Sequence, residues 1–259
     1  MIHFFSQLVD ALSSLDPLVL LSIEMLFCFV SIILFLTFFG PAGLFIYSAI
    51  AIVAANCQVL KVVDFSFFSS PVVLGTVLFA SLYLATDILV EYYGEKTARL
   101  SVYLGFAAFA LWVLIMLVTV GYKPSSVSLV EDAAIRTLFI PMPAFFIAGM
   151  TAYLVSQLYD IFIFQFIKKK THGRYLWFRN LCSTLIASLI DNAIFSILAF
   201  VVLAPTPLPW ESVIYTYILG TFGFRAVMAL LDTPFLYLAR YAIVCHEKYF
   251  ARHFTLIRT

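Results

Sequence analysis

Seven long apolar runs divide the chain, and each approaches or exceeds the roughly 20 residues that a helix needs to cross the ~30 Å hydrocarbon core of a bilayer. The runs cover residues 18–39, 42–60, 72–91, 102–121, 138–167, 180–204 and 213–240. Segments with Gly, Pro or basic residues separate them, including the basic loop at residues 168–179. Because lipid offers no partner to a free backbone group, such runs predict helices. We expect residues 1–259 to form one integral membrane domain, an all-α polytopic transmembrane bundle of about seven helices.

Composition agrees with a membrane protein. Hydrophobic residues make up 64% of the chain and charged residues 11%, and the mean hydropathy is +1.06. This leaves too little polar surface for a soluble globular domain. The net charge is only +1, so nothing in the charge balance indicates nucleic-acid binding, and we exclude it. The first 17 residues contain no Lys or Arg, so we expect the first apolar run to remain in the mature protein rather than act as a cleaved signal.

The basic residues are divided unequally between the two ends of the predicted helices. If the N-terminus is outside, the inner loops and tail hold Lys96, Arg99, Lys168, Lys169, Lys170, Arg174, Arg179, Arg240, Lys248, Arg252 and Arg258. The outer segments then hold only Lys61, Lys123 and Arg136. Cytoplasmic loops near helix ends are enriched in Lys and Arg. We therefore predict an outer N-terminus and a cytoplasmic C-terminus, in the inner or plasma membrane.

Charged and amide side chains within the apolar runs are the candidates for function. A charge at the bilayer centre costs about 2.5 to 3.5 kcal/mol on insertion scales, so it needs a partner or a function. The candidates are Glu24, Asp87, Glu91, Asp160, Asp191, Arg225 and Asp232, supported by Asn56, Gln58, Gln157, Asn180 and Asn192. The acids outnumber the single base. Some acids must therefore be solvated near helix ends, protonated, or directed at a water-filled cavity or a ligand.

Asp87 and Glu91 are four residues apart, so they share a face of the third predicted helix. Glu91 is near the cytoplasmic end, where it can pair with Lys96 or Arg99 without any further role. Asp87 lies deeper in the predicted helix. It is therefore the stronger candidate for a functional site.

The last predicted helix carries both Arg225 and Asp232. They lie seven residues apart, roughly 10 Å along one helix face, so they cannot bond each other. Arg225 can instead neutralise Asp160 or Asp191 on a neighbouring helix as a purely structural ion pair. Pro234 is expected to kink the helix beside Asp232.

A short internal similarity links residues 158–164 (LYDIFIF) with residues 189–195 (LIDNAIF). The aspartates at its equivalent positions are Asp160 and Asp191. Because the two segments belong to consecutive helices, they run in opposite directions. We expect the two carboxylates to meet near the middle of the membrane.

Enzyme signatures are not found in the sequence. The four histidines, His3, His172, His246 and His253, all lie outside the predicted helices. No Gly-x-Ser-x-Gly elbow and no Gly-Lys-Ser/Thr phosphate loop occurs. We therefore expect no enzymatic activity, catalytic residues, metal site or cofactor.

Residues 86–99 (TDILVEYYGEKTAR) resemble the signature of the queuosine precursor transporter family, within the vitamin uptake transporter group. Further matches are Ala55-Asn56 with Lys61; Ser156 to Asp160 followed by Arg179-Asn180, Ser183-Thr184 and Asp191; and Phe224-Arg225 leading to Asp232-Thr233-Pro234 and Tyr237. The matches cover residues 54–237 and leave out the first helix. The resemblance implies import of a 7-deazaguanine base such as queuine or a pre-queuosine base. It also implies a six-helix core similar to the substrate-binding subunits of energy-coupling vitamin transporters, plus an N-terminal helix.

The resemblance also implies a substrate site. Its predicted residues are Asp160, Asp191, Gln157, Asn180, Asn56, Asp87, Glu91, Arg225 and Asp232. Asp160 and Asp191 would contact the ligand, and the amides of Gln157 and Asn180 would recognise it through hydrogen bonds. Asp87 and Arg225 would gate the site or balance its charge. A carboxylate can accept adjacent N–H donors of a guanine-like ring, and aromatic side chains can stack on its face.

The chain departs from the family pattern in these motifs at three positions. Val90, Ser188 and Arg225 stand where the family has Asn, Gln and Lys. Because amides discriminate between bases through fixed donors and acceptors, the exact ligand stays open.

Two alternatives remain at this point. The chain could bind another vitamin and depend on a separate energising module, which would co-purify with it. It could instead be a structural or assembly protein, in which case every acid should be paired and no cavity should exist. A homodimer formed through small-residue helix faces is possible.

Overall fold

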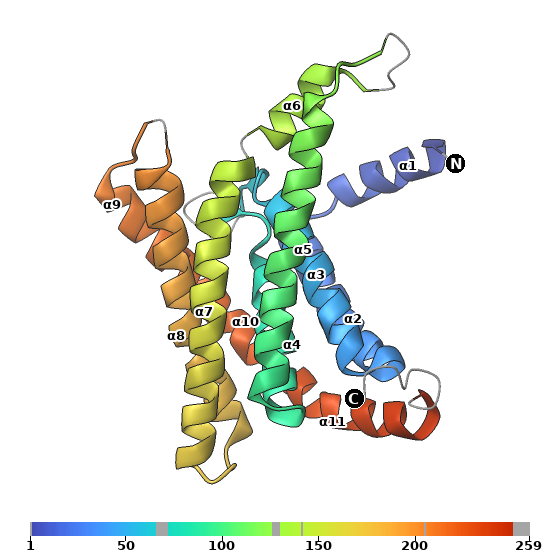
Figure 1. Cartoon of the computed structure of the whole chain (residues 1–259), viewed down its shortest axis with the longest axis vertical. Helices are drawn as coiled ribbons and strands as arrows, with labels where there is room; N and C mark the ends of the chain where they lie inside the picture. Colours follow the sequence, from blue (N-terminus) through green and yellow to red (C-terminus); the bar gives the residue numbers. More distant parts are fainter. Residues whose placement is uncertain (1, 66–71, 126–129, 141, 205, 251–259) are drawn as a thin grey trace.

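The computed structural model describes residues 2–65, 72–125, 130–140, 142–204 and 206–250, and most of them are helical (Figure 1). The helices are α1 (Ile2–Ser13), α2 (Pro17–Phe39), α3 (Pro41–Gln58), α4 (Thr76–Tyr92), α5 (Glu95–Gly121), α6 (Asp132–Phe139), α7 (Met142–Lys170), α8 (Leu176–Ile197), α9 (Trp210–Ser212), α10 (Gly220–Leu231) and α11 (Thr233–Cys245). Segments of π-helix, η1 (Leu198–Val202), η2 (Val213–Leu219) and η3 (His246–Phe250), extend or join them. Two short strands, β1 (Val62–Val63) and β2 (Val72–Val73), pair antiparallel.

Six helical stretches among the described residues are long and apolar enough to cross a membrane. They are Pro17–Phe39, Pro41–Gln58, Glu95–Gly121, Phe146–Lys170, Leu176–Val202 and Trp210–Tyr249. The predicted polytopic helical bundle is thereby confirmed. The run predicted at residues 72–91 corresponds to α4, which has 17 residues and begins at Thr76. Its apolar side chains are mostly buried against protein, which explains why so short a helix is so hydrophobic.

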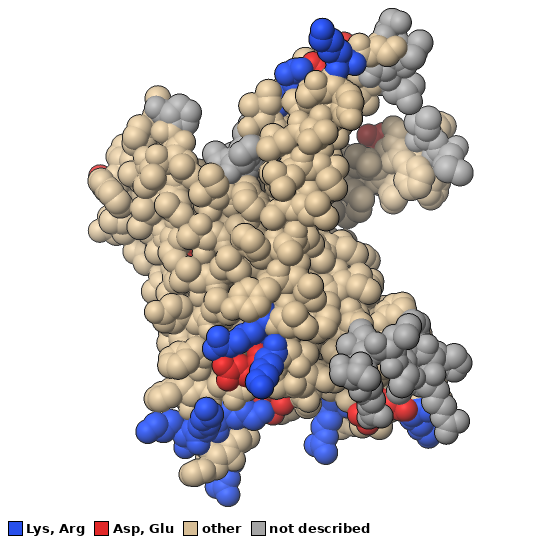
Figure 2. Space-filling model, viewed as in Figure 1, with Lys and Arg blue, Asp and Glu red and all other residues tan. Residues whose placement is uncertain are grey.

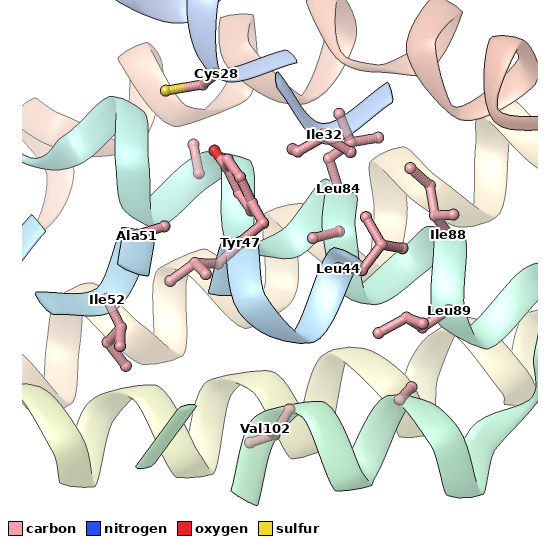
Figure 3. Close-up of a cluster of buried hydrophobic side chains, with 14 of the residues drawn as sticks. Cys28, Ile32, Leu44, Tyr47, Ala51, Ile52, Leu84, Ile88, Leu89 and Val102 are labelled. Atoms are coloured by element: carbon pink, nitrogen blue, oxygen red, sulfur yellow. The ribbon is translucent and has the colours of Figure 1, made fainter. Parts of the chain in front are cut away.

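Helix α4 lies at the centre of the bundle, in contact with α2, α3, α5, α7 and α11. Figure 3 shows part of this core, in which Tyr47 of α3 points toward Cys28 of α2; Leu84 of α4 belongs to the same cluster. The Tyr47 hydroxyl and the Ser81 hydroxyl are 2.6 Å apart and join α3 to α4. Hydrogen bonds between helices in membrane proteins contribute about 0.6 kcal/mol on average. Close packing around α4 therefore holds the bundle together more than any single bond.

A tight corner joins α2 to α3 at Gly40, whose positive φ of 60° suits glycine. Pro41 begins α3, where its missing N–H costs no helical hydrogen bond. Gly43 in the first turn of α3 packs so closely against α2 that a Cβ there would lie 2.1 Å from the Phe35 carbonyl oxygen. Only glycine can occupy this position without moving the backbone.

Gly43→Ala is therefore expected to destabilise the protein by about 1 to 3 kcal/mol, the range for overpacking a tight contact. A fall in Tm of the purified protein in detergent would show it. The matched control is Gly121→Ala at the end of α5, where an added Cβ meets nothing within 4 Å. Equal Tm values for the two variants would contradict the close approach of α2 and α3.

The last predicted helix is broken where the sequence indicated. Helix α10 ends at Leu231, Asp232 follows, and α11 begins at Thr233 with Pro234 in its first turn. The kink predicted at Pro234 is confirmed. Helix α11 then lies against α2, so Asp232 sits at a bend inside the protein.

Candidate functional site

Basic side chains mark one end of the molecule. Figure 2 shows Lys and Arg gathered at the lower end of the visible face, with a smaller group at the upper end beside α6. We call this lower end, where α7 ends at Lys170 and α8 begins at Leu176, the basic end. Arg252 and Arg258, which were predicted to add to it, lie outside the described residues. Among the described residues, three groups of buried polar side chains contain most of the predicted site residues.

The first group is the pocket pair, Asp191 of α8 and Arg225 of α10. Arg225 Nη1 lies 2.6 Å from Asp191 Oδ2, and both side chains are nearly buried. The Ser156 hydroxyl of α7 donates to Asp191 Oδ1 at 3.2 Å. Arg225 Nε has no hydrogen-bond partner among the described residues. The structural ion pair considered from the sequence is thus present, with Asp191 as the partner.

The pocket pair lines a pocket whose empty space is ≈570 Å³, counting the part that is open to the outside. The lining residues are Val59, Leu74, Thr76, Phe79, Gly149, Ala152, Asp191, Asn192, Phe195, Ser196, Phe200, Tyr217 and Arg225. Phe200 and Tyr217 lie with ring centroids 4.3 Å apart, and Phe195 meets Phe200 edge to face at 5.9 Å. The end of α3, the start of α4 and the end of α8 all contribute, so the pocket lies toward the end opposite the basic end (Figure 1). It combines aromatic faces with one carboxylate and one guanidinium.

The second group is the acid cluster, which consists of Asp87, Asp160, Asp232 and Asn180. All four side chains are buried. Asp87 of α4 and Asp160 of α7 are neighbours, close enough for the two carboxyl groups to interact electrostatically. Asn180 Nδ2 donates to Asp232 Oδ1 at 2.9 Å, and the Thr184 hydroxyl donates to Asp87 Oδ2 at 3.4 Å. The cluster joins α4, α7, α8 and the bend between α10 and α11.

The third group is the basic-end triad, Glu91, Lys168 and Arg179. Glu91 Oε2 lies 2.5 Å from Arg179 Nη2 and 2.9 Å from Lys168 Nζ. Arg179 is 1% exposed, and it also donates to the Gly173 carbonyl at 3.0 Å. The triad ties the end of α4 to α7 and α8, and so closes the bundle on this side.

The structure divides the predicted substrate residues among these groups. Asp191 and Arg225 line the pocket, whereas Asp87, Asp160, Asp232 and Asn180 form the acid cluster and Glu91 belongs to the triad. Asn56 lies beside the pocket, since its Oδ1 is 3.1 Å from where a Cβ on Gly149 would stand. Gln157 Oε1 is 2.8 Å from the Thr86 hydroxyl, between α4 and α7.

The expected meeting of Asp160 and Asp191 does not occur in the structure. The axial alignment of α7 and α8 brings Asp191 level with Ser156, one turn away from Asp160. Asp160 faces Asp87 instead. Sequence similarity located the two acids but did not determine this one-turn offset.

The partner proposed for Glu91 was also wrong. Arg99 pairs with Glu95 on its own helix at 2.7 Å, while Glu91 pairs with Arg179 and Lys168. Sequence reasoning placed Arg179 among the loop cations, although it adjoins Asn180 at the start of a long apolar run. That position was the available signal for a buried role.

Glu24, the candidate acid in the first predicted helix, has a partner within the chain. It accepts a 2.6 Å hydrogen bond from Gln58 Nε2, which joins α2 to α3. This acid lies apart from the three groups.

The family and the relatives that match this chain are all described as transporters. The family described as "Putative vitamin uptake transporter" matches residues 73–239, which contain all three groups. A Bacillus subtilis (strain 168) protein named "Probable queuosine precursor transporter" is 31% identical over 221 residues, covering 85% of this chain and 93% of the relative. A Haemophilus influenzae (strain ATCC 51907 / DSM 11121 / KW20 / Rd) protein of the same name is 30% identical over 138 residues, 53% of this chain and 54% of the relative. No solved structure matches the chain.

Proposed function

The chain belongs to the vitamin uptake transporter family, and from that premise we propose that it imports a queuosine precursor, a 7-deazaguanine base such as queuine or a pre-queuosine base. The observation that carries the proposal is the 31% identity to the Bacillus subtilis protein over 93% of that protein's length. The protein is a multi-pass membrane protein. We place it in the cytoplasmic membrane, where import of a base supplies the cell interior.

The pocket chemistry supports such a ligand. A guanine-like ring presents adjacent N–H donors, and the Asp191 carboxylate can accept both. The same ring offers carbonyl and ring-nitrogen acceptors to Arg225. Phe195, Phe200 and Tyr217 supply aromatic faces for stacking, which can contribute about 1 to 3 kcal/mol per base.

The arrangement of the three groups supports an outward-facing importer. If the basic end is cytoplasmic, as its Lys and Arg content favours, the pocket lies toward the outer side. The acid cluster and the basic-end triad then lie between the pocket and the cytoplasm. Import requires these inner contacts to open after the pocket has closed.

Cells that lack their own importer and express this protein are expected to take up labelled queuine or a labelled pre-queuosine base saturably. Asp191→Asn should abolish uptake, because it removes the negative acceptor from the pocket. Tyr217→Leu should raise KM by removing a stacking face while leaving the ion pair in place. Glu24→Gln is the matched control, because its amide oxygen can still accept from Gln58.

Membrane abundance of each variant is measured beside uptake, so that a folding defect is not mistaken for a transport defect. If the wild type takes up the base and neither Asp191→Asn nor Tyr217→Leu changes that uptake, the pocket is not the substrate site. Uptake of another vitamin but of no precursor would overturn the substrate assignment. Capture of an energising module with the purified protein would favour the binding-subunit alternative.

A further inference from the structure

The acid cluster holds more buried acceptors than the described part of the chain supplies donors for. Asp87 and Asp160 are both 0% exposed. Asp87 Oδ1, both carboxylate oxygens of Asp160 and Asn180 Oδ1 have no hydrogen-bond partner in the part of the chain that the structure describes. An unpaired buried carboxylate is costly, so native proteins pair or neutralise such groups. Something other than these protein donors must satisfy the cluster.

No cation among the described residues is available for this purpose. On the pocket side of the cluster, Arg225 already pairs with Asp191. On the other side, Arg179 and Lys168 already pair with Glu91.

The remaining groups that face the cluster are uncharged. From α8, Thr184 donates to Asp87, and Ser183 faces Asp160 but donates to the Asn180 carbonyl at 3.3 Å. From α4, Tyr83 lies close to Asp160, Asp191 and Arg225. The three carboxyls of the cluster are therefore buried without a balancing positive charge among the described residues.

The burial of these neighbouring carboxyls, without enough donors or a cation within the described ranges, indicates what satisfies them. Two ionised carboxylates buried as neighbours repel each other, and a proton on one of them removes this repulsion and supplies a donor. We propose that the acid cluster is a proton-binding site, separate from the substrate pocket, and that it couples import of the base to proton influx. This inference rests on the proposed function only for its cargo.

The position of the cluster gives coupling a physical route. A proton from the outer side forms an O–H bond on an Asp160 or Asp87 oxygen, and the loss of one charge lets α4 and α7 stay packed. Release of that proton to the cytoplasmic side restores two facing carboxylates, which push α4 and α7 apart. Helices α4 and α7 also carry pocket residues on the outer side of the cluster and triad residues on its cytoplasmic side. Proton release therefore favours opening toward the cytoplasm.

The proton site can be tested without any substrate. Infrared spectra of the purified full chain are expected to show the carbonyl stretch of a protonated carboxyl at neutral pH, and the band should disappear at alkaline pH. Asp87→Asn and Asp160→Asn should each change this band, whereas Glu24→Gln should not. A spectrum without a band that responds to these two substitutions would overturn the proposal.

Coupling is tested in proteoliposomes, with the membrane potential clamped by K⁺ and valinomycin. If one proton enters with each base, an external pH one unit below the internal pH should support about a tenfold accumulation of labelled base in the wild type. Asp160→Asn should lose this accumulation but still exchange labelled for unlabelled base. Glu24→Gln should accumulate as the wild type does.

The outcomes separate coupling from cargo. Uptake that ignores the pH gradient, or that follows a Na⁺ gradient instead, would overturn proton coupling while leaving the proposed function intact. A wild type that neither binds nor moves any 7-deazaguanine base would overturn the proposed function. The infrared titration would still decide the proton site in that case.

Discussion

Arg225→Met is expected to abolish transport and to lower stability by about 3 to 5 kcal/mol, the cost of leaving a buried charge without its partner. The substitution keeps a flexible, unbranched side chain, shorter than that of Arg, but removes the donor that lies 2.6 Å from Asp191. Asp191 would then retain only the Ser156 hydroxyl at 3.2 Å. The measurements are Tm in detergent and uptake of labelled base.

The double variant Asp191→Asn with Arg225→Met separates the two effects. Because it removes both charges, it should recover most of the lost Tm, since neutral replacements for buried pairs are often tolerated. It should not recover uptake, because the pocket has lost its charged contacts. Recovery of uptake in the double variant would show that the pair is structural only.

Arg179→Met is expected to have the second-largest effect, a loss of about 3 kcal/mol in stability together with impaired uptake. Its guanidinium is buried against Glu91 at 2.5 Å, and removing one member of such a pair typically costs 2 to 5 kcal/mol. Lys168 remains beside Glu91 and should limit the loss. The change in Tm is compared with that of a matched exposed pair.

Arg99→Met provides that comparison. Arg99 is 40% exposed and pairs with Glu95 at 2.7 Å, one turn away on the same helix. Exposed pairs of this kind contribute about 0.3 to 0.5 kcal/mol, so its Tm should hardly change. Similar losses for Arg179→Met and Arg99→Met would contradict a buried role for Arg179.

The predicted substrate residues show which contacts residue spacing along a helix can predict and which it cannot. Spacing placed Arg225 and Asp232 too far apart to bond, and the proline at position 234 indicated the helix break beside Asp232. It did not identify the partners of Glu91, because Arg179 approaches from α8 and belongs to a different segment of the chain. The pocket aromatics Phe200 and Tyr217 were also missed, since Phe and Tyr occur throughout an apolar membrane sequence.

The sequence by itself determined that this protein is a bundle of membrane helices with acids inside them, because hydropathy and helix length depend only on local composition. Its motifs were also enough to indicate the family. Only the tertiary structure decided that Asp191 pairs with Arg225 and that Asp160 faces Asp87. The reason is that partners across helices depend on the rotation and axial offset of neighbouring helices. A shift of one turn, about 5.4 Å, exchanges one partner for another without changing the pattern along the chain.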